Sequence, residues 1–243
     1  TRISITIFPF KSWKNGIKAY EMMSCYQGLL ELYLATGHAP YLQAVEATAR
    51  NIIDEEINAA GSGAAFECWY HGRRFETAPA YHMMETCVTT TWMRFCATLL
   101  RVTGQAVYGD QLEKTAYNAY LATLARDCST FSKYCPLGGT RSRGNDQCGM
   151  TINCCVANGP RGFVALAESL LMADAEGVMV NIYHASKANI ALPAGGGSVS
   201  VEQETDYPKG NRVLLRVTPE RESAFALKLR IPEWTQPGGS VKL

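Results

Sequence analysis

Four side chains that could bind a metal stand in two short motifs of this 243-residue sequence. Glu85 and Cys87 are separated by one residue, and Cys154 and Cys155 are adjacent. Three thiolates favour zinc among the common metals, and one carboxylate would complete a tetrahedron. Residues two apart on a regular helix face different directions, so we expect Glu85 and Cys87 at an extended helix start and the adjacent cysteines in irregular backbone. The alternative is that these thiols are small, buried hydrophobic groups.

A second group of residues could act on a sugar. Glu67 lies beside aromatic residues, where a low dielectric would raise the pKa of its carboxyl and keep it a proton donor near neutral pH. Glu76 is the competing donor. Trp69 and His82 are candidates for contacting a substrate, although packing in the core is the alternative for the indole ring. Arg143, in a glycine-rich loop, could bind a carboxylate or a polar substrate edge.

Composition and charge exclude two classes of partner. The net charge of +1 provides no basic surface for nucleic acid, and no run of 18 uncharged apolar residues indicates a membrane span. A hydrophobic content of 47% with 19% charged residues is typical of globular proteins. The nine cysteines fit reduced thiols plus a metal better than a disulfide framework. This favours a bacterial cytoplasm, or a periplasm in which metal protects the thiols.

Hydrophobic periodicity and capping residues predict five helices, over residues 16–37, 40–57, 79–102, 108–126 and 161–175. A repeat with an offset of 67 residues links the first four: Thr36 and Gly37, for example, recur as Thr103 and Gly104. A fixed offset across a helix–turn–helix indicates that one αα-hairpin occurs twice, as in an α/α toroid. Two hairpins and one further helix do not close a toroid, so we expect the remainder upstream of Thr1.

Near residue 176 the sequence changes to short runs of β-forming residues between Gly and Pro turns. Strands are predicted over residues 178–183, 190–192, 198–203, 213–217 and 225–231. The predicted fold is therefore mainly α with a β module, in which residues 1–176 form part of a toroid and residues 177–243 a truncated β-sandwich. The chain starts at Thr1 and ends within a predicted strand, so we expect a piece of a longer protein.

Six motifs, taken in order, make the chain resemble glycoside hydrolase family 127, the β-L-arabinofuranosidase-like family. They lie at residues 18–23, 67–69, 84–87, 147–150, 153–162 and 229–234. The resemblance spans nearly the whole chain. It implies that residues 1–176 are the C-terminal part of an (α/α)6 catalytic barrel and that residues 177–243 begin a β-sandwich domain. The implied partner is an oligosaccharide or glycan from plant cell walls that bears β-L-arabinofuranose. A homodimer is the assembly that we consider for the protein.

The resemblance also implies a catalytic role for particular residues. Zinc would be held by Glu85, Cys87, Cys154 and Cys155, with Cys154 as the nucleophile. Its thiolate would attack the anomeric carbon to give a thioglycosyl intermediate, and water would then release the sugar with retained configuration. Glu67 is the implied acid/base that protonates the leaving oxygen and later activates water.

Some residues differ from those of the best-known members. Lys18 stands where they carry a sugar-contacting His, and Ile152 where they place another Cys. A different furanose is thus conceivable, including a branched acidic one from pectin, with Lys18 or Arg143 as its carboxylate partner. Two other classes stay open. One is a toroid lyase or epimerase, in which Cys154 would be dispensable, and the other is a non-catalytic glycan-binding protein with structural zinc.

Overall fold

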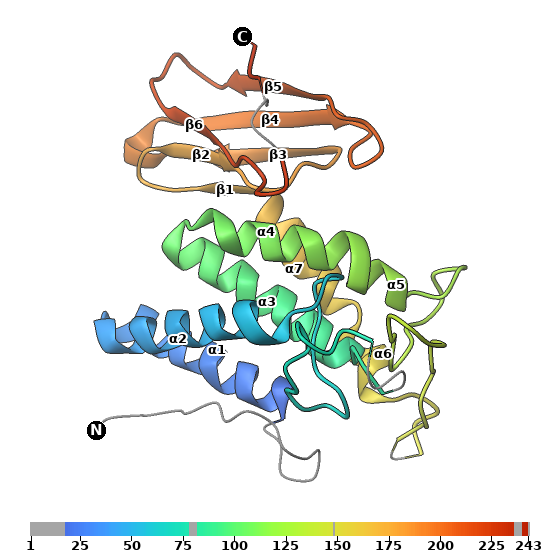
Figure 1. The fold of residues 1–243 in the computed structure, drawn as a ribbon. Coiled ribbons are helices and arrows are strands. Elements are labelled where there is room, and N and C mark those ends of the chain that lie inside the picture. The colour runs from blue at the N-terminus through green and yellow to red at the C-terminus, as the bar shows by residue number, and fades with distance from the viewer. Residues whose placement is uncertain (1–17, 78–81, 148, 236–239, 243) are drawn as a thin grey trace.

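A computed structural model describes residues 18–77, 82–147, 149–235 and 240–242. Helices fill one end of the molecule and strands the other, and the chain passes from the first to the second after α7 (Figure 1). The main helices are α1 (Ala19–Thr36), α2 (Ala39–Asn51), α3 (Thr86–Thr103), α4 (Ala106–Thr115), α6 (Cys154–Asn158) and α7 (Arg161–Leu170). The π-helical segments η2 (Ile52–Glu56) and η3 (Ala116–Tyr120) continue α2 and α4, and the short α5 (Leu121–Thr123) follows η3.

The two helical hairpins have the same corner, which confirms the predicted repeat. Gly37 and Gly104 end α1 and α3 with φ angles of 67° and 68°, values that favour glycine. One residue earlier, the hydroxyls of Thr36 and Thr103 each donate to the carbonyl four residues before them. Each hydroxyl also accepts the N–H of the residue after the glycine. The offset of 67 therefore reflects two copies of one hairpin; closure into a toroid stays a prediction.

With the π-helical segments counted, two helix boundaries differ from the expected ones by five residues or more, and the others by less. The helix predicted from residue 79 begins at Thr86, because His82 and Met84 have φ angles of 52° and 51° and Met83 forms an antiparallel bridge with Ala65. Residues 78–81 lie outside the described residues. The helix predicted to reach residue 175 ends at Leu170, since the next three residues form a strand instead. Tertiary pairing overrides local helical preference in both places.

The β part contains two three-stranded sheets. One has the order β1 (Leu171–Ala173), β2 (Gly177–Val180) and β6 (Ala226–Leu229), and the other β3 (Ser186–Ala191), β4 (Ser198–Thr205) and β5 (Val213–Pro219). All pairs are antiparallel except β2 with β6. Val178, from the first sheet, is buried in one cluster with Val199 and Val201 of the second. The five expected strands are present, and β1 is additional; the complete sandwich stays a prediction.

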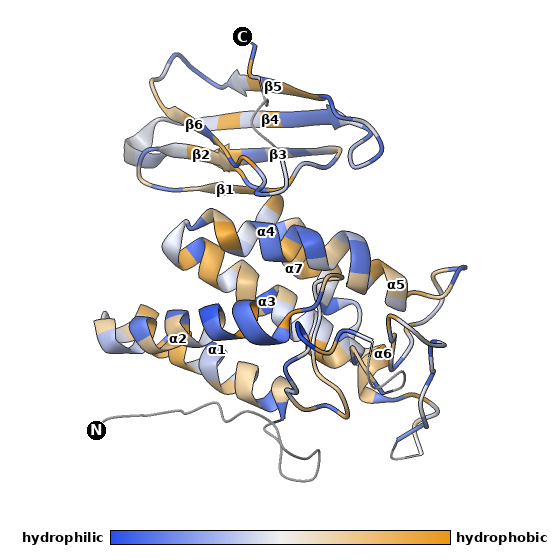
Figure 2. Cartoon of the chain, in the orientation of Figure 1, coloured by the Kyte–Doolittle hydropathy of each residue, from blue (hydrophilic) through white to orange (hydrophobic). Residues whose placement is uncertain are grey.

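A large apolar core occupies the helical part, with Trp69, Trp92 and Tyr108 fully buried. Hydrophobic and hydrophilic segments mix along α2 and α4, as expected for amphipathic helices that cover such a core (Figure 2). One buried guanidinium joins the two ends of the molecule, since Arg230 pairs with Asp110 and Glu113 of α4. Among the helices in the described part of the chain, none has the length and apolar character needed to cross a membrane.

Candidate active site

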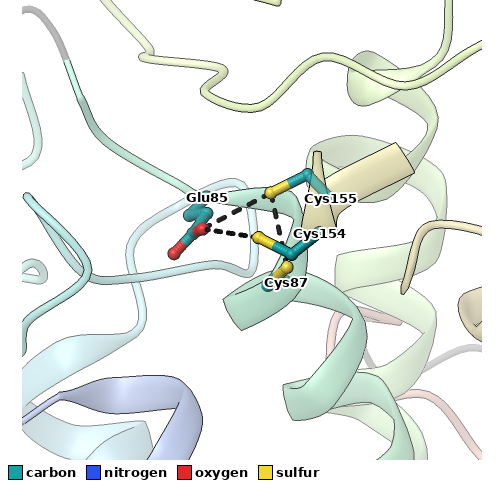
Figure 3. Close-up of side chains that lie close together, drawn as sticks. All are labelled: Glu85, Cys87, Cys154 and Cys155. Atoms are coloured by element: carbon teal, nitrogen blue, oxygen red, sulfur yellow. Dashed lines mark hydrogen bonds between the residues drawn. The ribbon is translucent and has the colours of Figure 1, made fainter. Parts of the chain in front are cut away.

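The predicted metal-binding side chains meet at one place. One ligand atom each from Glu85, Cys87, Cys154 and Cys155 lies within 4.8 Å of the other three. The Cys155 Sγ is 3.4 Å from both the Cys87 Sγ and the Glu85 Oε1, and the Cys154 Sγ is 3.9 Å from that same oxygen (Figure 3). The structure therefore brings together two motifs that are about 70 residues apart in the sequence.

Two helix starts position these four groups. Glu85 is the extended N-cap residue of α3, with φ −57° and ψ 133°, and Cys87 lies in the first turn. The extended start predicted from the spacing of this pair is thus confirmed. Cys154 and Cys155 are the first two residues of α6, whereas irregular backbone was expected. The buried Asn153 side chain caps this helix by accepting the N–H of Cys155 and of Val156, so both thiols are presented from a regular turn.

The donor set fits a tetrahedral thiophilic metal such as zinc. With Zn–S bonds of about 2.3 Å, neighbouring sulfurs in a tetrahedron stand about 3.8 Å apart. The Cys87 and Cys155 sulfurs stand 3.4 Å apart, close to that value, and all four ligand atoms lie within 4.8 Å of one another. Glu85, Cys87 and Cys155 are buried, and Cys154 is exposed. One of the four groups can therefore meet a molecule from solution while the other three stay covered.

The electrostatics of the cluster favour a bound cation. Burial, helped by the charge of Glu67, raises the pKa of Glu85 to about 7. Burial and the nearby Cys87 raise the pKa of the Cys154 thiol to about 12, and the hydrogen bond with Cys87 raises the pKa of Cys155 further. Only Cys87 has a lowered pKa, because its hydrogen bond with Cys155 outweighs burial. Ionising all of these groups together thus requires a compensating positive charge.

A cavity of about 240 Å³ opens onto the cluster. Glu85, Cys87 and Cys154 line one part of it, and Glu67 lines another. Tyr20 and Glu21 of α1, with Gln147 and Asn158, complete the lining. A carboxylate and an exposed thiol therefore share one small cavity beside the candidate metal site.

The environment of Glu67 differs from the expected one. Burial does raise the pKa of this carboxyl, but the hydrogen bond and charge of Lys18, together with Lys133, outweigh it and hold the pKa below its usual value. The Lys18 ammonium pairs with Oε2 of Glu67, and the Lys133 ammonium lies 3.4 Å from Oε1. The expectation of a raised pKa was wrong. The nearby aromatic residue Trp69 packs in the helical core, and the Glu67 carboxylate is paired with two lysines instead.

Comparison with known proteins agrees with this arrangement. Residues 10–168 match the family described as β-L-arabinofuranosidase, GH127 catalytic domain, and residues 177–243 match the GH127 middle domain. The chain belongs to glycoside hydrolase family 127. A comparison with curated proteins finds no significant match.

Three solved structures have the same fold as this GH127 chain. A GH127 β-L-arabinofuranosidase from Geobacillus stearothermophilus T6 has a TM-score of 0.77 at 22% identity, covering 90% of this chain and 36% of its own. The GH127 β-arabinofuranosidase BT3674 has a TM-score of 0.77 at 27% identity, covering 89% and 34%. A third glycoside hydrolase has a TM-score of 0.69 at 22% identity, covering 90% and 40%. This chain therefore spans well under half the length of each.

Four other predicted site residues of this GH127 chain are absent from the cavity lining in the described part of the chain. Trp69 is fully buried in the helical core. The ring of His82 stacks on Tyr134, with 4.6 Å between centroids. The guanidinium of Arg143 is exposed, 3.4 Å from Asp146. Glu76 accepts the N–H of Ala59 and is absent from the lining in the described part of the chain.

Besides Tyr20 and Glu21 in the cavity lining, three polar residues that contact Glu67 or the metal-binding cysteines were not anticipated from the sequence. The Asn158 amide donates to the Cys87 Sγ at 3.2 Å, and Gln147 accepts the N–H of Cys154 at 2.8 Å. Lys133 reaches Glu67, as described above. Asn158 and Gln147 fall inside the motifs that carry the family resemblance, so those motifs were a usable signal. Lys133 lies outside the motifs, and nothing local in the sequence pointed to it.

Proposed function

We propose that the protein containing this chain is a retaining glycoside hydrolase that uses Cys154 as its nucleophile and Glu67 as its acid/base. The observation that carries this proposal is the exposure of Cys154 among four clustered metal-binding groups, three of which are buried. A closed structural metal site would be expected to cover all four ligands. A lyase would have no use for an exposed thiol at this place.

The proposed reaction has two steps. The Cys154 thiolate attacks the anomeric carbon, the glycosidic C–O bond breaks, and Glu67 gives its proton to the leaving oxygen. A water molecule then attacks the same carbon, Glu67 takes a proton from it, and the C–S bond breaks to restore the thiolate. Each step inverts the anomeric carbon, so the released sugar keeps its configuration. The shared cavity supports this assignment of Glu67 over Glu76.

We propose Zn²⁺ as the metal, held by Glu85, Cys87, Cys154 and Cys155. When bound, zinc would stabilise the thiolate form of Cys154 near neutral pH. The raised pKa of this thiol gives the reason that such help is needed. Asn158 would orient Cys87 among the ligands, and Gln147 would fix the backbone that carries Cys154.

The substrate we propose is a plant cell-wall glycan bearing β-L-arabinofuranose. The names of two structural relatives support a β-arabinofuranoside. We further propose that residues 1–176 belong to an (α/α)6 barrel and residues 177–243 to a β-sandwich. Lys18 is paired with Glu67, and Arg143 is outside the cavity lining, so neither offers a free cation for an acidic sugar. A homodimer stays a prediction.

Covalent labelling tests the role of Cys154. The protein is incubated with an arabinofuranosyl electrophile and its peptides are mapped by mass spectrometry. We expect one sugar adduct on the peptide containing Cys154, and none there in Cys154→Ala. Equal labelling of Cys25→Ala, which removes an exposed thiol on α1, controls for general thiol reactivity. Unchanged labelling of Cys154→Ala would exclude this cysteine as the nucleophile.

A further inference from the structure

The two oxygens of Glu67 bind lysines of different character. The Lys18 side chain, on Oε2, is 49% exposed, whereas the Lys133 side chain, on Oε1, is 13% exposed. An exposed ion pair exchanges readily with water, and its energy is small. A covered pair is screened less and holds its geometry better. Lys133 is therefore the more persistent partner of the carboxylate.

The backbone of Lys133 is attached to the helix start that carries two metal-binding residues. Its carbonyl accepts the N–H of Thr86, between Glu85 and Cys87, at 2.9 Å. The preceding carbonyl, of Ser132, accepts the Thr86 hydroxyl at 2.6 Å. The segment around Lys133 and the N-terminus of α3 therefore form one hydrogen-bonded unit.

The side chain of Lys133 is also confined. Its ammonium lies 5.1 Å from the centre of the Tyr134 ring, within the range of a cation–π contact. Gly144 packs on its methylene groups so closely that a Cβ there would stand 2.6 Å from the Lys133 Cδ. The left-handed φ of 72° at Gly144 suits glycine as well. The ammonium is thus directed at Glu67 from a crowded, fixed stem.

We propose that Lys133 is a positioning residue for the reaction, holding the Glu67 carboxylate at the cavity wall and in register with the metal-binding helix start. This rests on the proposed function, because it assumes that Glu67 is the acid/base. Lys133 would stabilise the carboxylate that forms when Glu67 gives up its proton in the first step.

The charge environment of Glu67 makes the proposal measurable. In the described part of the chain, the titratable groups that face Glu67 or line its cavity are Lys18, Lys133, Glu85, Glu21, Tyr20, Cys68, Cys87, Tyr134 and Cys154. Of these, the two lysines hold the pKa of Glu67 down. A cation within about 4–6 Å lowers a carboxyl pKa by about 1–3 units. Removing the covered lysine should therefore raise the pH at which Glu67 loses its proton.

The test is the pH profile of kcat/KM for Lys133→Met. In a retaining enzyme the alkaline limb reports loss of the acid's proton. The two lysines hold the pKa of Glu67 below its usual value, so this limb lies on the acid side of neutral pH in the wild type, and we expect it to move up by about one pH unit in Lys133→Met. Lys133→Arg, which keeps the charge, should restore the profile. Lys187→Met removes an exposed lysine of β3 that pairs with Glu202, and should leave the limb in place. An unmoved alkaline limb in Lys133→Met would overturn the inference.

Glu67→Gln separates failure of this inference from failure of the proposed function. If Glu67 is the acid, this variant loses the alkaline limb, and it loses more rate on a poor leaving group than on a nitrophenolate. If Glu67→Gln keeps the wild-type limb, the proposed role of Glu67 is wrong, and the inference falls with it. If Glu67→Gln loses the limb while Lys133→Met keeps it, only the role of Lys133 is wrong.

Discussion

Asn158→Asp should weaken zinc binding without altering the shape of the site. The Asn158 Nδ2 donates to the Cys87 Sγ at 3.2 Å, and Arg161 donates to the Asn158 Oδ1 at 2.8 Å. The arginine fixes the orientation of the amide, so the nitrogen faces the sulfur. Aspartate keeps the size of the side chain and the pairing with Arg161, but it replaces the donor to sulfur with an acceptor.

The size of the effect follows from the position of the lost hydrogen bond. Removing a group that orients a metal ligand reduces metal affinity by about 10- to 100-fold, which is about 1.4–2.7 kcal/mol. We therefore expect the zinc dissociation constant of Asn158→Asp to be about 10- to 100-fold higher than that of the wild type.

Competition with a chromophoric chelator at fixed pH measures the zinc dissociation constant directly and needs no substrate. Asn189→Asp, at an exposed position of β3, is the matched control and should bind zinc like the wild type. Equal zinc affinity in Asn158→Asp and in the wild type would refute the reasoning, because the amide could then have no part in orienting Cys87.

Three further predictions concern stability. Gly159→Ala would place a Cβ 2.4 Å from the Phe131 ring and should lower the free energy of unfolding, measured in urea, by about 1–3 kcal/mol. Gly28→Ala, on the open face of α1, should raise this free energy by about 0.5–1 kcal/mol. Similar free energies of unfolding for the two variants would contradict this prediction. Arg230→Leu leaves the buried Glu113 and the half-buried Asp110 without their cation and should lower the free energy of unfolding by about 3–5 kcal/mol by calorimetry. A loss below about 1 kcal/mol would mean that the network contributes little. Because the pKa of Glu67 is lowered on folding, its ion pairs stabilise the protein above the unfolded-state pKa of about 4.3 and are lost as the pH falls further. Glu67→Gln should thus melt below the wild type at pH 7, and the gap should narrow as the pH falls below about 4.3. A gap that does not narrow in acid would count against this.

The sequence alone determined features that depend on near neighbours along the chain. The repeated hairpin corners were predictable because a helix ends where glycine takes a left-handed φ, and Gly37 and Gly104 do so at an offset of 67 residues. The grouping of three thiols and a carboxylate as a candidate metal site was a hypothesis from the residue types, and the family resemblance joined the two motifs into one set. The extended start at Glu85 followed from a spacing of two residues.

Only the tertiary structure decided the charge and exposure of each group. Lys133 is 66 positions beyond Glu67 in the sequence, so no local pattern could predict that it would reverse the direction of the pKa shift. Trp69 is buried because its ring packs in the helical core, whereas Glu67, two residues earlier, lines the cavity. The start of α3 moved because Met83 pairs with a distant segment. Local propensities fix conformations over a few residues, whereas solvation and charge depend on every element that packs nearby.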